Sequence, residues 1–222
     1  VPLSTHLLEK KWGHIFFTGS PKVGKIIMKA ASQTLSSVSL ELGGKSPCVV
    51  DETADLESTA RKLAWGKFIN AGQTCIAPDY ILVHEDVKDE LVDKLKSVTI
   101  DMFKEQPIES TDYARIITKD HTKRFDSLIR DAIEKGANIL HGGRIEMDKK
   151  YVSPTFIDQV TMDMKIMEEE IFGPILPILS YKNKEEVINT IDSLEKPLSM
   201  YICSKSSKNI QYFINHSTAG GT

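Results

Sequence analysis

Cys75 lies in a segment that could expose a reactive thiol. Residues 72–78 read Gly-Gln-Thr-Cys-Ile-Ala-Pro and follow a long expected helix, and their small side chains would leave the sulfur accessible. A thiolate attacks electrophilic carbon when its pKa is lowered or a base lies nearby. A lone cysteine can equally be an inert buried residue, and Cys48 and Cys203, inside apolar strand-like runs, fit that interpretation. Cys75 is therefore a candidate nucleophile, with a structural role left open.

Glu41 is a candidate general base. It stands near the end of an expected strand, in the segment 41–47 that reads Glu-Leu-Gly-Gly-Lys-Ser-Pro. Strand ends commonly present reactive groups in α/β sheets, and a partly buried glutamate has a raised pKa suited to accepting a proton. A solvated glutamate at a strand end is the alternative for this residue taken alone.

The segment 19–25, Gly-Ser-Pro-Lys-Val-Gly-Lys, lies between an expected strand and an expected helix. Unpaired amides and the helix dipole at such a junction favour a phosphate. The segment is close to the P-loop pattern of nucleotide hydrolases, and Asp51 and Glu52 could act as a magnesium-binding acidic pair. However, Ile26 replaces the hydroxyl residue that the P-loop needs for magnesium. A phosphate or dinucleotide site, a P-loop and an ordinary tight turn all remain open on this motif alone.

Residues 168–174 read Glu-Glu-Glu-Ile-Phe-Gly-Pro. Acidic runs are usually solvated faces. The apolar and rigid continuation here indicates a shaped, partly buried loop, in which one of the three carboxylates could turn toward the hydroxyls of a ligand.

Alternating strand-like and helical segments must position these residues. The pattern predicts an α/β domain in which helices cover a mostly parallel sheet. Strands are expected at 14–18, 37–42, 47–51, 80–84, 138–140, 175–181 and 198–203. One helix is expected to end near 33, and another is expected to begin near 55. Four further helices are expected at 87–103, 122–135, 185–194 and 206–215, and a loop is expected at 106–113.

Composition excludes several classes of protein. The 222 residues include 41% hydrophobic and 27% charged residues, and the net charge of −3 gives no reason to expect nucleic acid as a partner. Three cysteines without metal-ligand spacing indicate a reducing compartment and no metal site. With no signal peptide and no membrane segment, we expect a cytoplasmic protein. The start at Val1 and the end in an apparent turn suggest a piece of a longer protein.

Four motifs, taken together and in order, resemble the aldehyde dehydrogenase superfamily. They begin at Phe17, Glu41, Gly72 and Glu169 and read Phe-Thr-Gly-Ser, Glu-Leu-Gly-Gly-Lys-Ser-Pro, Gly-Gln-Thr-Cys and Glu-Glu-Ile-Phe-Gly-Pro. The spacing of 34 residues from Glu41 to Cys75 also matches the family, and residues 72–80 are most similar to its class 3 branch. The resemblance extends over essentially the whole chain.

The resemblance implies an oxidoreductase that converts an aldehyde to a carboxylate. Cys75 would be the nucleophile that forms a thiohemiacetal and then a thioester, and Glu41 would deprotonate the hydrolytic water. The amide of Cys75 would supply one donor to the oxyanion, and the family's second donor, an Asn, lies upstream of this chain.

The resemblance also implies an NAD or NADP cofactor. Gly19, Ser20 and Gly24 would line its pyrophosphate, Glu170 would bind the hydroxyls of the nicotinamide ribose, and Phe172 would pack beside that ribose. No metal is implied.

The same resemblance implies a domain organisation. Residues 1–41 would be the C-terminal part of a Rossmann-like NAD-binding domain, and residues 42–222 would be the catalytic domain, truncated at its end. We expect this chain to be a weakly active or inactive piece of an enzyme that forms homodimers. A nucleotide hydrolase and a non-catalytic α/β module are the alternatives.

Overall fold

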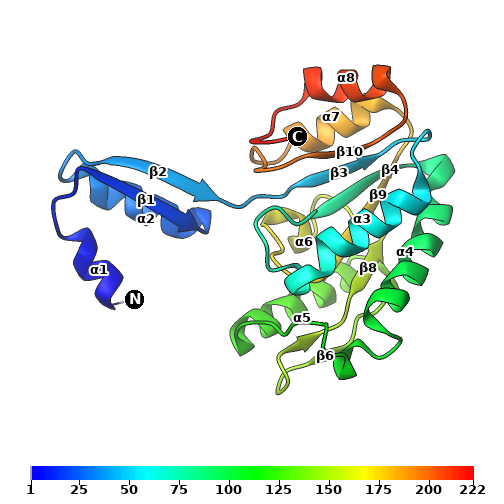
Figure 1. Ribbon diagram of the computed structural model, residues 1–222, viewed down its shortest axis with the longest axis horizontal. Coiled ribbons are helices and arrows are strands. Elements are labelled where there is room, and N and C mark those ends of the chain that lie inside the picture. The colour runs from blue at the N-terminus through cyan, green and yellow to red at the C-terminus, as the bar shows by residue number, and fades with distance from the viewer. Residues whose placement is uncertain (1) are drawn as a thin grey trace. The chain divides into compact units, whose positions relative to one another are not determined.

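The computed structural model of the chain describes residues 2–222 and divides it into two compact units, one ending at Gly43 and one spanning Gly44–Thr222 (Figure 1). None of the helices in this described range is long and apolar enough to cross a membrane.

The first unit is a strand–helix–strand element preceded by a short helix. Its elements are α1 (Pro2–Leu8), β1 (His14–Gly19), α2 (Pro21–Ser32) and β2 (Ser37–Leu42). β1 and β2 pair in parallel, as expected when a helix connects two strands of one sheet. Ser20 caps α2 by accepting a hydrogen bond from the Val23 amide, and Pro21 occupies the first turn, where no amide hydrogen is needed.

The second unit contains a six-stranded sheet in the order β10-β3-β4-β9-β8-β5. All neighbouring pairs are parallel except β8 and β5. The strands are β3 (Pro47–Val50), β4 (Tyr80–His84), β5 (Asn138–His141), β8 (Thr155–Asp158), β9 (Ile175–Tyr181) and β10 (Tyr201–Cys203). A separate antiparallel pair consists of β6 (Ile145–Glu146) and β7 (Tyr151–Val152).

Helices cover this sheet, and α3 and α4 lie side by side (Figure 1). The helices are α3 (Leu56–Phe68), α4 (Lys88–Phe103), α5 (Lys119–Glu134), α6 (Lys165–Glu168), α7 (Lys184–Asp192) and α8 (Ser207–His216). Short 3-10 turns occur at η1 (Ile69–Gly72), η2 (Glu85–Val87) and η3 (Pro107–Glu109).

The sequence pattern of α3 illustrates why these segments fold as they do. Asp55 caps the helix by accepting from the Ser58 amide, as its residue type predicts. The apolar face repeats at helical spacing and is buried in the core, through Leu56, Ala60, Leu63, Ala64 and Phe68. The mostly parallel, helix-covered α/β architecture is confirmed.

Several elements differ from the expectation. The last strand was expected from residue 198 but begins at Tyr201, because Met200 donates to the carbonyl of Gly221 before β10 begins to pair with β3. α5 begins at Lys119, three residues early, because Thr118 accepts from the His121 amide and caps it. The short strands β6, β7 and β8 were not expected, since two to four residues give little periodic signal.

Candidate active site

Cys75 lies in a loop that the end of α3 forces into an unusual shape. After Phe68 the backbone enters the left-handed region at Asn70, Ala71 and Gly72, with φ of 52°, 51° and 71°. This conformation is costly for residues with a Cβ atom and reverses the chain within one turn. Cys75 then occupies a turn and is half-buried.

Two side chains tie this loop to the rest of the second unit. The Gln73 amide group donates to the carbonyls of Asn70 and Arg115 at 2.9 and 3.1 Å, and its oxygen accepts from the Ile117 amide at 2.9 Å. On the other side of Cys75, the Tyr201 hydroxyl donates to the Ile76 carbonyl at 2.5 Å. The thiol is therefore held between two anchored positions.

The loop 170–173 contacts the Cys75 loop through glycine. A Cβ atom on Gly72 would stand 2.3 Å from the Gly173 carbonyl oxygen, and one on Gly173 would stand 2.2 Å from the Phe125 ring. Neither distance is possible for a real side chain, so both positions require glycine. This close approach brings the Cys75 loop against the loop that contains Glu170 and Phe172.

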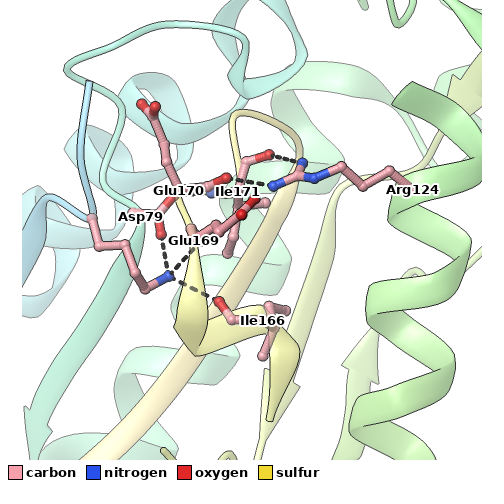
Figure 2. A network of polar contacts seen from close by, with 7 residues as sticks. Asp79, Arg124, Ile166, Glu169, Glu170 and Ile171 are labelled. Atoms are coloured by element: carbon pink, nitrogen blue, oxygen red, sulfur yellow. Dashed lines mark hydrogen bonds and ion pairs between the residues drawn. The ribbon is translucent and has the colours of Figure 1, made fainter. Parts of the chain in front are cut away.

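A buried ion pair lies beneath both loops. Lys45 Nζ and Asp79 Oδ2 are 2.5 Å apart, and both side chains are at most 5% exposed. Lys45 also donates to the carbonyls of Ile166 and Glu169, and the second oxygen of Asp79 accepts from the Ile171 amide at 2.9 Å (Figure 2). The pair thus bonds directly to the backbone of the 166–171 segment.

The topology explains why these residues meet. Lys45 precedes β3, Asp79 immediately precedes β4, and Ile171 precedes β9. Because these three strands are parallel neighbours, the residues that precede them lie together at the end of the sheet where the strands begin. This end of the sheet is opposite to the carboxyl ends of the strands, where α/β sheets commonly bind ligands.

Arg124 of α5 fixes the same loop from the other side. Its guanidinium donates to the Glu170 carbonyl at 2.6 Å and to the Ile171 carbonyl at 2.8 Å (Figure 2). The planar fork of arginine suits two adjacent carbonyls. The loop therefore keeps one backbone conformation, including the left-handed Phe172, whose φ is 49°.

Of the three carboxylates at 168–170, only Glu170 is half-buried, while Glu168 and Glu169 are exposed. Burial and the nearby Asp79 raise the pKa of Glu170 to about 7, although the Gly44 amide, Lys67 and Arg124 partly oppose the shift. Glu170 therefore changes charge near neutral pH.

Lys67 of α3 is fully buried in the same region. Burial is the main cause that lowers its pKa to about 8, with Lys45 adding to the shift and Asp79 and Glu170 opposing it. The region thus contains two lysines and two acidic groups whose charges depend on one another.

The remaining candidates lie in the first unit. Ser20 stands at the N-cap of α2, next to Gly19 at the end of β1. Gly24 is buried, and a Cβ atom there would stand 3.0 Å from Leu42 Cδ2, so this glycine permits α2 to approach β2 closely. Glu41 is exposed on β2. Their assigned roles, like those of Cys75, Glu170 and Phe172, stay predictions.

Four residues of this region were not singled out from the sequence. Lys45 lies inside the motif that begins at Glu41, and Asp79 lies in residues 72–80. A charged residue within two positions of an apolar strand is a signal of a buried charge that could have been used. Lys67 and Arg124 occupy ordinary helical positions, and nothing in their local sequence indicates burial or the bonds they make.

Comparison with known proteins gives a consistent result. The model of the aldehyde dehydrogenase family matches residues 4–222. The chain is 46% identical over 221 residues to mouse aldehyde dehydrogenase family 3 member A2, covering 100% of this chain and 45% of that protein. It is 43% identical over 221 residues to the dimeric NADP-preferring aldehyde dehydrogenase of rat, covering 100% and 48%.

A solved structure agrees closely with the fold. Substrate-bound AldH of Staphylococcus aureus superposes with a TM-score of 0.94 at 45% identity, covering 98% of this chain and 47% of that one. The chain thus spans about half the length of the relatives that it matches.

The contact between Gly72 and Gly173 predicts that a side chain at position 72 destabilises the fold. Gly72→Ala should lower the free energy of unfolding by more than about 2 kcal/mol, because it combines a left-handed Cβ with a backbone clash. Gly136→Ala is the control, since Gly136 also has positive φ but faces open space, and should cost about 1 kcal/mol. Urea unfolding measures both, and equal losses would contradict the proposed contact.

The buried ion pair predicts a second difference. Lys45→Met removes the direct partner of a buried carboxylate and should cost about 3 kcal/mol of unfolding free energy. Lys119→Met breaks an exposed pair with Asp148 and should cost less than about 1 kcal/mol. A Lys45→Met protein as stable as the Lys119→Met protein would show that the pair does not hold the loops.

The raised pKa of Glu170 predicts a pH dependence. Its protonated form is favoured in the folded state, so this contribution to stability is complete below the unfolded pKa of about 4.5 and is lost as pH rises through about 7. Glu170→Gln cannot ionise and should gain about 2 kcal/mol of stability relative to the wild type between pH 5 and pH 8. The exposed Glu168→Gln is the control, and a similar pH trend in both variants would refute the assignment.

Proposed function

Because the chain belongs to the aldehyde dehydrogenase family, we propose that the protein of which it is a part oxidises an aldehyde to a carboxylate with NAD or NADP, using Cys75 as the nucleophile. One observation supports this assignment most directly. The second unit holds the Cys75 loop against the Glu170 loop through the contact of Gly72 with Gly173. The loop of the proposed nucleophile, Cys75, thereby lies against the loop of Glu170, whose carboxylate could bind a ribose.

Cys75 would attack the carbonyl carbon of the aldehyde as a thiolate. The bond from sulfur to carbon turns the carbonyl oxygen into an oxyanion, which needs fixed donors. Among the described residues, the Cys75 amide donates no hydrogen bond. That free N–H supports its use as one oxyanion donor in the thiohemiacetal.

The residues around Glu170 fit a dinucleotide. A half-buried carboxylate that ionises near pH 7 can accept hydrogen bonds from a pair of ribose hydroxyls, and Arg124 fixes the backbone that presents it. Phe172 is 38% exposed, so its ring is available to pack against that ribose. NAD or NADP, held beside Glu170 and Phe172, would supply the hydride acceptor that the oxidation needs, and Cys75 would then carry the acyl group as a thioester.

The first unit supplies two further parts of the proposal. Ser20 and the first turn of α2 present backbone amides and a helix dipole suited to a pyrophosphate, with Gly19 beside them. Gly24 serves this site through close packing of α2 on β2. Glu41 would take a proton from the water that hydrolyses the thioester, releasing the carboxylate and restoring the Cys75 thiol.

The hydrogen bonds of Asp51 argue against the alternative of a P-loop hydrolase, in which this residue would bind magnesium. The Asp51 carboxylate accepts from the Thr53 amide and hydroxyl and, at 2.8 Å, from the Asn209 side chain. Burial acts to raise the pKa of Asp51, but the hydrogen bonds from Ser204, Asn209 and Thr53 together lower it. They give Asp51 a structural role between β3 and α8. Together with Ile26, this favours the dehydrogenase.

We also propose that the complete protein forms a homodimer, since the rat relative is described as dimeric.

Ester hydrolysis tests the nucleophile without a cofactor. The chain should acquire an acyl group on Cys75 from p-nitrophenyl acetate, detected by intact mass and peptide mapping. Cys75→Ser should lower the rate of p-nitrophenol release at least tenfold, and Glu41→Gln should make the acyl adduct persist because deacylation slows.

Cys203→Ser is the matched control for this experiment, since it removes another accessible thiol and should keep both the Cys75 adduct and the turnover. Unchanged hydrolysis in Cys75→Ser would refute the assignment of the nucleophile.

A further inference from the structure

Cys48 and Cys203 lie close together although 155 residues separate them in the chain. Cys48 is on β3 and Cys203 is on its neighbour β10, and their sulfur atoms are 3.9 Å apart. Tyr201 pairs with Cys48, and Cys203 is two residues further along its strand, so both thiols project from the same face of the sheet. They are diagonal neighbours on adjacent strands.

This pair opens onto a cavity of about 280 Å³ between the sheet and α3. Its wall includes both cysteines and Tyr201 from the strands and Thr59 and Lys62 from α3. Lys205 and Asp55 contribute charges at the same cavity. Because the cavity wall includes polar and charged side chains and the cavity is large enough for several water molecules, a small polar molecule can reach the half-buried Cys203.

The two thiols have different acidities. The hydrogen bond from Cys48 is the main cause that lowers the pKa of Cys203 to about 7, with Thr59 and Lys62 contributing and burial and Asp51 opposing. The pKa of Cys48 is raised well above its usual value by the bond with Cys203, by its complete burial and by the charge of Cys203. The contact between the two sulfur atoms therefore favours the thiolate at Cys203 and the neutral thiol at Cys48.

We propose that Cys48 and Cys203 form a redox site, separate from Cys75, that a small hydroperoxide oxidises to an intramolecular disulfide. The Cys203 thiolate attacks the terminal peroxide oxygen, the O–O bond breaks, and the departing alkoxide or hydroxide takes up a proton, leaving a sulfenic acid on Cys203. The Cys48 sulfur then attacks the Cys203 sulfur, the S–O bond breaks, and hydroxide leaves with the proton of Cys48 as water. Two thiols lose two electrons in total, and the hydroperoxide is reduced by two electrons to an alcohol and water.

The position of β10 favours closure of this bond. A disulfide requires sulfur atoms about 2.05 Å apart and Cα atoms within about 6.8 Å, whereas diagonal neighbours on adjacent strands lie about 7–8 Å apart. Closing the 3.9 Å gap between the sulfur atoms therefore needs a shift of β10 toward β3 as well as rotation of the two side chains. β10 has three residues and lies at the edge of the described sheet, where it pairs with β3 alone among the strands. A short edge strand can shift with less cost than one held on both sides.

Mass spectrometry after oxidation tests the proposal on the complete chain. The Cys75→Ser protein retains only the two thiols in question and should be exposed to a small excess of hydrogen peroxide and then blocked with N-ethylmaleimide. The expected product has lost two hydrogen atoms, takes up no N-ethylmaleimide, and gives a cross-linked peptide containing Cys48 and Cys203. The same cross-link should form in the wild type.

Two controls make the result decisive. Cys48→Ser removes the resolving sulfur but keeps a hydroxyl that can donate to Cys203, so a sulfenic acid should form and persist on Cys203 and be trapped by dimedone. The chain unfolded in urea should form the cross-link at least tenfold more slowly than the folded chain, because only the fold brings the thiols together.

Three outcomes would overturn the proposal. These are stepwise oxidation of Cys203 to sulfinic acid without a cross-link, dimedone labelling of Cys48 in place of Cys203, and equal rates of cross-linking in the folded and unfolded chains.

Discussion

The buried pair of Lys45 and Asp79 is the interaction on which the candidate site depends. Two charges removed from water must satisfy each other and their remaining hydrogen bonds, or the fold loses several kcal/mol. Here the remaining bonds go to the backbone at Ile166, Glu169 and Ile171. Because the pair must be fully hydrogen-bonded, it fixes the segments that precede β3, β4 and β9 at the amino-terminal ends of these strands. The Cys75 and Glu170 loops pack against these segments.

Local sequence signals were sufficient for most elements of the fold. The cap at Asp55, the apolar repeat of α3 and the bounds of Ser37–Leu42 and Tyr80–His84 follow from residue types and spacing. The left-handed conformation of Asn70 and Ala71 could not be predicted, because alanine disfavours it and the surrounding structure alone imposes it. Arg124 was equally hidden, since its partners are the backbone of a segment 46 residues away.

The burial of Cys48 and Cys203 could also be predicted only in part from the sequence. Cys48 and Cys203 each occupy an apolar strand, and the sequence favoured two inert buried thiols. Complete burial is confirmed for Cys48, whereas Cys203 is half-buried. The difference arises because β10 lies at the sheet edge and beside β3, and strand order is a property of the whole chain. A thiol's environment depends on that order more than on its flanking residues.

Tyr201 connects the two cysteine sites. Its ring lines the cavity of Cys48 and Cys203, and its hydroxyl bonds to the carbonyl of Ile76, next to Cys75. A displacement of β10 that accompanies disulfide formation would change this bond and with it the free energy of the Cys75 loop. Thermodynamic reciprocity then requires the converse. A ligand that binds at equilibrium against the Cys75 loop would then shift the reduction potential of the Cys48–Cys203 pair by the same coupling free energy.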